Sequence, residues 1–371
     1  MKILHININY PVRPRLHGTM LRHLDNCGVE NVMFAPANND LCKENIDIAD
    51  NVHVVKCFNT IDRVLFDYKQ YKIKKALLDN VDVESFDCIH AHTLFSDGNC
   101  ARNLSIRYGI PYIVAVRNTD VNTFFKYAFY LRARGIRIMR DAKRIVFLSK
   151  AYRDYVIREY VPSAYKEDFL KKSAIIPNGI DDFWLLNKYI RDRAYKKPYR
   201  LHIVYVGEIT KNKNIPTIQK TVRILKDRGY DASLTIVGNI VEKNEFERIK
   251  RDECTKYIER VPKETLINLY RESDIFIMPS FTESFGLVYA EAMSQGLPVI
   301  YTQGQGFDKQ FAEGEVGFHV DPHSARDIAD KVELIMTGYN DITKRCVTLV
   351  DRFDWDILVH EYFDIYDEIT R

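Results

Sequence analysis

The sequence predicts an α/β fold of two Rossmann-like, doubly wound domains, and two observations lead to this prediction. Short apolar runs that are typical of buried strands alternate with longer segments of helical spacing through the first half of the chain. After a polar, basic and aromatic segment at residues 181–200, the same alternation begins again. A chain of 371 residues is long enough for two such domains, each with its own core.

The apolar runs predict the strands of two parallel sheets. In the first half they are residues 3–8, 32–35, 52–57, 88–91, 112–116, 145–148 and 174–176. In the second half they are residues 201–206, 234–237, 275–278, 298–301 and 318–320. We therefore place the domain boundary near residue 182, with domains at 1–182 and 183–352. Residues 353–371 have the helical spacing of an amphipathic helix that packs through Trp355, Leu358, Val359, Tyr362 and Tyr366.

The composition indicates the cellular compartment and the classes of partner that the chain can have. With 54 Lys and Arg against 51 Asp and Glu, the net charge of +3 argues against nucleic acid as a partner. Seven cysteines without a CxxC pair indicate neither a disulfide framework nor a zinc site, as in a reduced, cytoplasmic protein. The amino terminus does not have the pattern of a signal peptide, and no apolar run approaches the roughly 18 residues of a membrane span. We expect any membrane contact to be peripheral, at the inner face of the membrane.

Residues 282–291 are the most informative stretch for function. They connect the predicted strand at 275–278 to a predicted helix over 286–295, which stops at Gly296 before the strand at 298–301. In such a βαβ unit the strand-to-helix turn lies at the carboxyl edge of the sheet, where open α/β sheets bind ligands. We expect the helix-start amides of Phe285, Gly286 and Leu287 to face a phosphate, because Gly286 has no side chain to block close approach.

Two carboxylates flank this turn. At about 1.5 Å rise per residue, Glu291 lies roughly 7 to 8 Å further along the helix than Gly286. That distance exceeds the ~5 Å between the carboxylates of a retaining glycosidase, but it suits a ribose on one side of a diphosphate and a sugar on the other. The competing interpretation is that Glu283 and Glu291 are solvated surface residues, and the two carboxylates alone do not exclude it.

Four blocks in this order resemble glycosyltransferase family 4. They are Ile176–Asp181 (IPNGID), Val206-Gly207 with Lys213, Glu283 and Glu291 in an E-x7-E spacing, and 292–300 (AMSQGLPVI). The resemblance covers nearly the whole chain. It implies a GT-B fold, in which two Rossmann-like domains face each other across a cleft. The first domain would bind mainly the acceptor and the second a nucleotide sugar, and helix 353–371 would cross back to the first domain.

The resemblance also implies retaining transfer of a sugar without a metal ion, and it assigns roles by position. Glu291 would bind the ribose hydroxyls and Glu283 the donor sugar. Lys213, six residues after Gly207, would neutralise the donor diphosphate, unless it is a solvated loop lysine. The backbone amides that would face the phosphates and the sugar belong to Ser284, Phe285, Gly286 and Leu287.

The chain departs from the family pattern at two positions. Glu208 stands where an arginine usually follows the glycine, so one expected cation is missing, and Lys211 or Arg260 are the candidate substitutes. Arg117 stands where many members have a histidine. We expect its guanidinium to face the β-phosphate or the acceptor, and Asp120 to orient it or to accept a hydroxyl.

Two further segments of the first half are candidates for the cleft. His90 and His92 end the strand at 88–91; His90 is expected to be structural, and His92 is a candidate for contact with acceptor or donor. We expect no metal site, because no carboxylate or thiol accompanies this pair at ligand spacing. In the loop 9–19, Gly18 would allow close approach of donor or acceptor, although a simple helix-entry loop also explains it.

A helix that mixes cations with aromatic residues is expected within 126–144, as on an anionic lipid surface, although a solvated helix with an aromatic core side fits as well. We therefore expect an enzyme that moves a hexosyl unit from a UDP- or GDP-linked sugar to a carbohydrate or lipid-linked carbohydrate, in surface polysaccharide or glycolipid synthesis. No cofactor is expected besides this co-substrate. The alternatives are a catalytically silent GT-B partner subunit, which Glu208 and Arg117 favour, and a GT-B nucleotide-sugar epimerase or phosphorylase.

Overall fold

The computed structural model describes residues 1–12, 14–41, 50–190 and 200–371. These residues form two compact units. The first contains residues 1–148, 152–179 and 355–371, and the second contains residues 149–151 and 180–354. Residue 13 of the amino-terminal loop and residues 191–199 of the polar segment lie outside the described residues.

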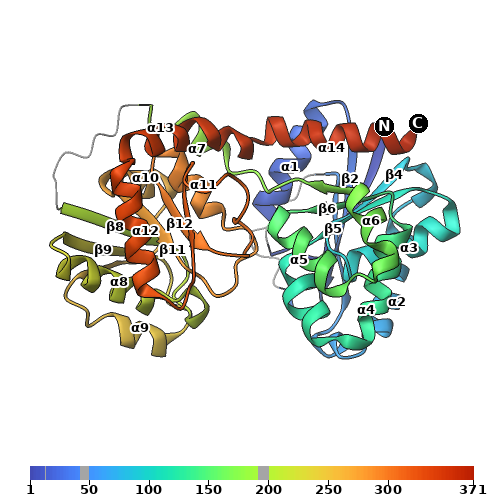
Figure 1. The fold of residues 1–371 in the computed structure, drawn as a ribbon. Coiled ribbons are helices and arrows are strands. Elements are labelled where there is room, and N and C mark those ends of the chain that lie inside the picture. The colour runs from blue at the N-terminus through green and yellow to red at the C-terminus, as the bar shows by residue number, and fades with distance from the viewer. Residues whose placement is uncertain (13, 42–49, 191–199) are drawn as a thin grey trace. The chain divides into compact units, whose positions relative to one another are not determined.

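The first unit is built on a parallel seven-stranded sheet with the strand order β3-β2-β1-β4-β5-β6-β7 (Figure 1). Its strands are β1 (Lys2–Ile6), β2 (Glu30–Asn38), β3 (Val52–Phe58), β4 (Cys88–Ala91), β5 (Tyr112–Val116), β6 (Arg144–Phe147) and β7 (Ser173–Ile175). Its helices are α1 (Pro14–Asn26), α2 (Phe66–Asn80), α3 (Ser96–Tyr108), α4 (Arg132–Asp141), α5 (Lys150–Tyr160), α6 (Ser163–Lys171) and α14 (Trp355–Thr370). Alternate residues of each strand contribute to two separate cores, one on each face.

Helix α14 packs on the first unit, against α1 and β4. The five side chains expected to form its apolar side are all buried, which confirms that part of the prediction. Gly179 shows why the chain has a glycine near this helix. A Cβ added there would lie 2.5 Å from the Trp355 ring, so only glycine lets the backbone pass the indole.

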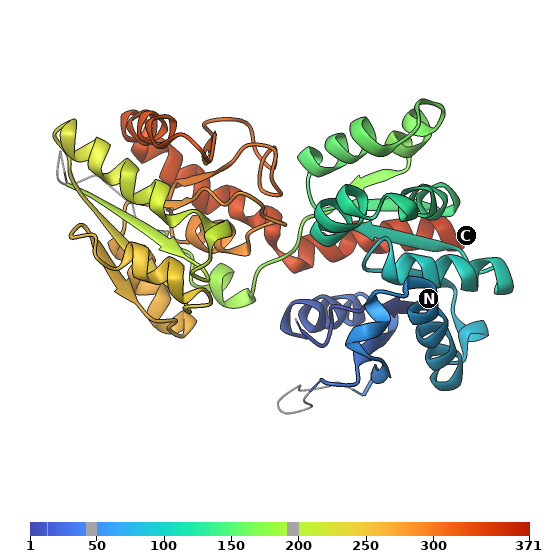
Figure 2. The same ribbon diagram turned by 90° about the horizontal axis from the view of Figure 1, so that it is seen from below.

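The second unit has a parallel six-stranded sheet with the order β10-β9-β8-β11-β12-β13. Figure 1 labels β8, β9, β11 and β12, and Figure 2 shows the same ribbon from below. Its strands are β8 (Arg200–Val206), β9 (Asp231–Val237), β10 (Thr255–Ile258), β11 (Ile275–Met278), β12 (Val299–Thr302) and β13 (Gly317–Val320). Its helices are α7 (Asp182–Leu186), α8 (Ile215–Asp227), α9 (Lys243–Ile249), α10 (Lys263–Glu272), α11 (Leu287–Ser294), α12 (Ala325–Thr337) and α13 (Tyr339–Leu349). Strand β10 was not predicted, because this edge strand contains no fully buried residue and so lacks an apolar run.

Each sheet reverses its strand order once, between β1 and β4 in the first unit and between β8 and β11 in the second. Ligands of doubly wound sheets bind at such switch points, beyond the carboxyl ends of the strands. In the second unit this position belongs to Gly207 and to the loop 279–286. In the first unit it belongs to the residues that follow Ile6 and Ala91. These loops are therefore the candidate ligand-binding sites of the two units.

Candidate active site

The loop between β11 and α11 is shaped by Gly286. Its φ of +75° lies in the left-handed region, and a Cβ added there would lie 2.5 Å from the Tyr289 ring. Tyr289 is fixed in turn, because its hydroxyl donates to the carbonyl of Met278 at 2.5 Å. Helix α11 consequently begins at Leu287, one residue later than expected.

The backbone amides at this helix start differ in availability. The amide of Ser284 donates to Glu283 Oε1 at 3.0 Å, so it is used within the protein. Among the hydrogen bonds of the described residues, none has the amide of Phe285, Gly286 or Leu287 as donor. Three of the four expected amides thus remain for an anion, at the positive end of the helix dipole.

Lys213 and Glu283 form an ion pair beside this loop. Lys213 Nζ lies 2.5 Å from Glu283 Oε2, and the two side chains are only 19% and 11% exposed. Lys213 ends a short turn after β8, and the next residue, Asn214, donates through Nδ2 to the carbonyls of Pro279 (3.1 Å) and Pro322 (2.6 Å). This anchor holds the turn against the loop, so the alternative that Lys213 and Glu283 are solvated is wrong.

A second loop, which follows β12, supports Glu283 from the other side. The Glu283 amide donates to Gln305 Oε1 at 2.9 Å, and the Gly306 amide donates to the Glu283 carbonyl at 3.0 Å. A Cβ on Gly306 would lie 1.8 Å from the Ser284 carbonyl oxygen, so the two loops touch through backbone. Gln305 was not predicted as a site residue, and its position between Gly304 and Gly306 was the available signal.

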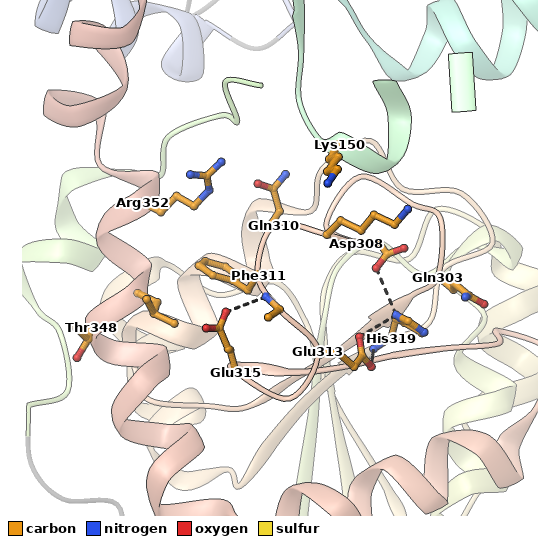
Figure 3. A pocket seen from close by; sticks show the side chains of 13 residues that line it. Lys150, Gln303, Asp308, Gln310, Phe311, Glu313, Glu315, His319, Thr348 and Arg352 are labelled. Carbon is orange, nitrogen blue, oxygen red and sulfur yellow. Dashed lines mark hydrogen bonds and ion pairs between the residues drawn. The ribbon is translucent and has the colours of Figure 1, made fainter. Parts of the chain in front are cut away.

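Figure 3 shows how charged side chains fasten this second loop. His319 Nδ1 lies 2.8 Å from Glu313 Oε2 and 3.4 Å from Asp308 Oδ1. Asp308 Oδ2 also accepts the amide N–H of Gly304 at 2.8 Å. The loop that positions Glu283 is therefore tied to β13 through Asp308 and His319.

Glu291 is partly buried on α11, so it is not the solvated helix residue of the competing interpretation. Burial raises the pKa of its carboxyl group to about 7, and the Asp181 carboxylate adds to the shift. A hydrogen bond with Tyr270 and the charge of Lys263 oppose it. Lys263 Nζ lies 2.8 Å from both Asp181 oxygens, so a cation stands near the two acids.

Gly207 lies where β8 and β9 end side by side. Its amide donates to the carbonyl of Val237 at 2.9 Å, and a Cβ on Gly238 would lie 1.9 Å from the Gly207 carbonyl oxygen. Glu208 is exposed, and its carbonyl accepts the Tyr205 hydroxyl at 2.8 Å. Lys211 and Arg260, the candidate substitutes for the missing arginine, are exposed as well.

In the first unit, Asp120 joins two loops. Its carboxylate accepts three backbone amides, those of Leu94 (3.0 Å), Phe95 (3.1 Å) and Arg117 (2.8 Å). Burial raises its pKa to about 6, and these hydrogen bonds and the Arg117 charge oppose the shift. The side chain is buried and both oxygens accept backbone amides, an arrangement that orients the Arg117 backbone.

Arg117 itself is fixed at the carboxyl end of β5. Its Nε donates to the carbonyl of His92 at 3.2 Å, and one terminal nitrogen donates to Asn178 Oδ1 at 3.2 Å. The guanidinium is half-buried. It connects the residue after β4 to the Asn178-Gly179 block.

His90 in β4 and His92, which follows that strand, are buried and form a cluster with a third histidine, His5. The rings of His90 and His92 stack at 4.0 Å, and His5 Nδ1 lies 3.1 Å from His92 Nε2. His5 was not recognised as part of this site, because a sequence does not state that β1 and β4 are neighbours. The expectation of no metal site was based on His90 and His92 alone and lacked this third ring.

Gly18 is not in a loop, which corrects the expectation. Helix α1 begins at Pro14, so Gly18 lies in its second turn. A Cβ added to Gly18 would lie 3.8 Å from the Tyr10 hydroxyl, an ordinary contact. The protein backbone itself does not require glycine at this position.

Comparison with known proteins relates this geometry to a family. A model described as "Glycosyltransferase Family 4" matches residues 18–182, and one described as "Glycosyl transferases group 1" matches residues 190–347. A D-inositol 3-phosphate glycosyltransferase of Paenarthrobacter aurescens is 27% identical over 73% of this chain and 70% of its own length. Two further relatives of that name are matched over 62% of their length, so the chain spans less than two thirds of them.

Solved structures show the same fold. Sucrose-phosphate synthase from Thermosynechococcus elongatus has a TM-score of 0.76 at 18% identity, over 100% of this chain and 99% of the other. Anabaena HepE, solved in complex with UDP and glucose, has a TM-score of 0.66 at 15% identity, over 99% and 100%. At these identities the likeness concerns the fold, and the predicted GT-B fold is confirmed.

Proposed function

The chain belongs to glycosyltransferase family 4, and from that premise we propose that it transfers a hexosyl unit from a UDP- or GDP-linked sugar to a carbohydrate or lipid-linked carbohydrate. We propose further that the transfer retains the anomeric configuration and needs no metal ion at the donor. The observation that carries the proposal is the partly buried Lys213–Glu283 pair beside three amides that donate no hydrogen bond among the described residues.

The reaction breaks the bond between the sugar C1 and the β-phosphate oxygen, and both electrons leave with the diphosphate. A hydroxyl oxygen of the acceptor forms the new bond to C1, and its proton passes to the leaving diphosphate oxygen. Negative charge grows on the leaving diphosphate, so fixed positive groups aimed at it stabilise the transition state. We assign this role to Lys213 and to the amides of Phe285, Gly286 and Leu287.

The two glutamates hold the rest of the donor in this proposal. We assign Glu283, whose amide donates to Gln305 and whose carboxylate accepts the Ser284 amide, to the hexosyl hydroxyls. Glu291 is assigned to the ribose hydroxyls, which its carboxylate form accepts best. Gly207 gives the diphosphate room at the end of β8.

We assign the acceptor mainly to the first unit. Arg117 is a fixed, half-buried guanidinium at the carboxyl edge of the sheet, suited to a phosphate of the donor or of the acceptor. The relative named for D-inositol 3-phosphate supports a phosphate-bearing acceptor. His92 and Gly18 are assigned to the same region, with Asp120 as the residue that positions Arg117.

A lipid-linked acceptor is supported by the surface of the first unit. Tyr127, Phe129 and Tyr130 are 65–75% exposed, and the guanidinium of Arg132 lies over the Phe129 ring at 4.5 Å. Exposed aromatic rings among cations suit the interface of an anionic membrane. No helix among the described residues is long and apolar enough to cross a bilayer. We therefore propose peripheral contact from the cytoplasmic side, in surface polysaccharide or glycolipid synthesis.

A screen of UDP- and GDP-sugars tests the proposal, with donor hydrolysis and transfer as readouts and NMR of the product to read its anomeric configuration. We expect turnover of one nucleoside diphosphate sugar with retention. Absence of both turnover and nucleotide binding would instead support a silent GT-B subunit. Interconversion of two free nucleotide sugars would support an epimerase.

A further inference from the structure

Three buried histidines meet at the switch point of the first sheet. His5 in β1 is the register partner of His90 in β4, and His92 follows that strand directly. All three side chains are at most 1% exposed. One ring nitrogen from each lies within 4.8 Å of the others, although the chain separates His5 from the other two by more than eighty residues.

The proton positions on His5 follow from Asn31. The Asn31 Nδ2 group donates to Asp25 Oδ1 at 2.8 Å and to the Val29 carbonyl at 3.0 Å, which fixes the orientation of the amide. Its Oδ1 therefore faces His5 Nε2, 2.8 Å away, and this nitrogen must carry the proton. His5 Nδ1 then carries no proton, and its lone pair is directed at His92 Nε2.

His90 has an outer partner of the same kind. Its Nδ1 lies 2.6 Å from the Tyr366 hydroxyl, which α14 supplies. Metal-bound imidazoles typically engage their second nitrogen with an oxygen in this way, because the outer bond fixes the ring and its tautomer. His5 with Asn31 and His90 with Tyr366 both have that arrangement.

Two buried nitrogens of the cluster have no hydrogen-bond partner among the described residues. They are His90 Nε2 and His92 Nδ1. Buried polar atoms are normally paired, and an ion held by the cluster would supply the missing partner of His90 Nε2.

We propose that His5, His90 and His92 bind one divalent transition-metal ion of the zinc type, as a structural site of the first unit. Two nitrogens at 2.0–2.1 Å from a tetrahedral zinc ion are about 3.3 Å apart, and His5 Nδ1 and His92 Nε2 are already 3.1 Å apart. Three imidazoles select ions such as Zn²⁺ or Co²⁺ over Mg²⁺ or Ca²⁺, which prefer oxygen ligands.

Binding requires one proton to move. The ion replaces the proton between His5 Nδ1 and His92 Nε2, and the His92 ring takes a proton on Nδ1 instead, so every ligand stays neutral. The fourth position is left for water or for His17, whose ring centre lies 5.2 Å from that of His92. The site would join β1, β4 and, through Tyr366, α14. This inference goes beyond the transfer reaction and does not depend on it.

Cobalt titration of the full chain, prepared without a histidine tag and stripped by a chelator, tests the site. We expect one equivalent of Co²⁺ to give the visible absorption of a tetrahedral complex, Zn²⁺ to displace it, and the melting temperature to rise. His90→Gln should abolish the signal. Tyr366→Phe, which keeps the buried ring, should weaken affinity about 10- to 100-fold. His53→Gln removes an exposed histidine and should change nothing.

Two results would overturn the proposal. One is the absence of a saturable one-to-one complex in the wild-type chain. The other is a complex that survives in His90→Gln and Tyr366→Phe but is lost in His53→Gln, which would place the ion on the surface. Circular dichroism of each variant identifies a loss of folding, and Tyr366→Phe keeps the test decisive if His90→Gln does not fold.

Discussion

Lys213 Nζ and Glu283 Oε2 lie 2.5 Å apart although 70 positions separate the two residues in the chain. The pair fixes a cation at the end of β8 beside the amides that begin α11, within one unit. Each side chain neutralises the charge of the other. Both can therefore be partly buried when no nucleotide sugar is bound. A bound diphosphate would then share Lys213 with Glu283, and no new cation would have to be recruited.

Gln305 should act as a positioning residue for Glu283. Gln305→Ala removes the acceptor of the Glu283 amide, so we expect kcat for sugar transfer to fall about tenfold, as a small displacement in an active site can cause. KM for the donor and the melting temperature should change little. Gln303→Ala, at an exposed position on the same loop, is the control. Equal kcat values for the two variants would contradict the positioning role.

Gly286 should be intolerant of any side chain. Gly286→Ala adds a Cβ 2.5 Å from the Tyr289 ring to a residue at φ +75°. Gly229→Ala is the matched control, because its φ is +95° and a Cβ there meets nothing within 4 Å. We expect Gly229→Ala to lower the free energy of unfolding by about 1 kcal/mol. Gly286→Ala should lower it clearly more, and urea denaturation measures both. Similar costs would show that Tyr289 moves aside without penalty.

Glu291 should make stability depend on pH. Its pKa is about 7 in the folded chain, above its ordinary value of 4.5. Between these values the folded state holds more protons than the unfolded state, so stability falls as pH rises from about 4.5 to 7 and levels off above. Glu291→Gln should lack this component when the two unfolding free energies are compared across pH. Parallel pH profiles would refute the shift.

Donor affinity should change with the same group in the opposite sense. If the ribose hydroxyls donate to Glu291, the carboxylate form binds them better, and the donor Kd should decrease as pH rises through 7. Glu291→Gln should bind more weakly and lose this dependence, measured by calorimetry. A pH dependence that persists in the variant would assign it to another group.

Asp120 should matter first for the stability of its unit. Asp120→Asn replaces one accepting oxygen by an NH₂ group that faces backbone N–H groups, so at least one buried amide loses its acceptor. We expect the free energy of unfolding, measured by urea denaturation, to fall by about 1–3 kcal/mol. Asp79→Asn, at an exposed position of α2, should be neutral. A stable Asp120→Asn variant would mean that the loops after β4 and β5 do not depend on this carboxylate.

The aromatic surface should bind anionic membranes. Tyr127, Phe129 and Tyr130 replaced together by serine should lower binding to phosphatidylglycerol vesicles in a flotation assay, and raised salt should weaken the wild-type binding. A variant in which the exposed Tyr68 and Tyr71 of α2 are replaced by serine is the control. Wild-type protein that does not bind these vesicles at low salt would exclude the contact.

The βαβ unit around residues 282–291 could be predicted because its signals are local. The run at 275–278 is wholly apolar, and Gly296 ends the helix before the next strand. Strand β10 could not be predicted, because this edge strand buries too little surface to need an apolar run. Gly18 was misplaced in a loop although Pro14, at the first position of α1, was a signal for a helix start.

The site was harder to predict where it depends on contacts between distant segments. His5 meets His90 only because β1 and β4 are adjacent, and strand order is not written in local spacing. Gln305 and Glu283 meet because two loops at one sheet edge touch. Glu291 owes its raised pKa to burial and to the Asp181 carboxylate, neither of which helical periodicity shows.

The most direct test of the central claim compares donor turnover by wild type, Lys213→Ala and Lys220→Ala in the presence of a chelator, at a temperature where all three are folded. Lys220 is an exposed lysine of α8 and serves as the control. We predict that wild type and Lys220→Ala keep their kcat/KM, whereas Lys213→Ala loses about 10²- to 10³-fold, as when one fixed transition-state partner is removed. Turnover that is lost in the chelator and restored by Mg²⁺, which the three imidazoles do not select, or normal turnover by Lys213→Ala, would contradict a donor diphosphate neutralised by this lysine without metal.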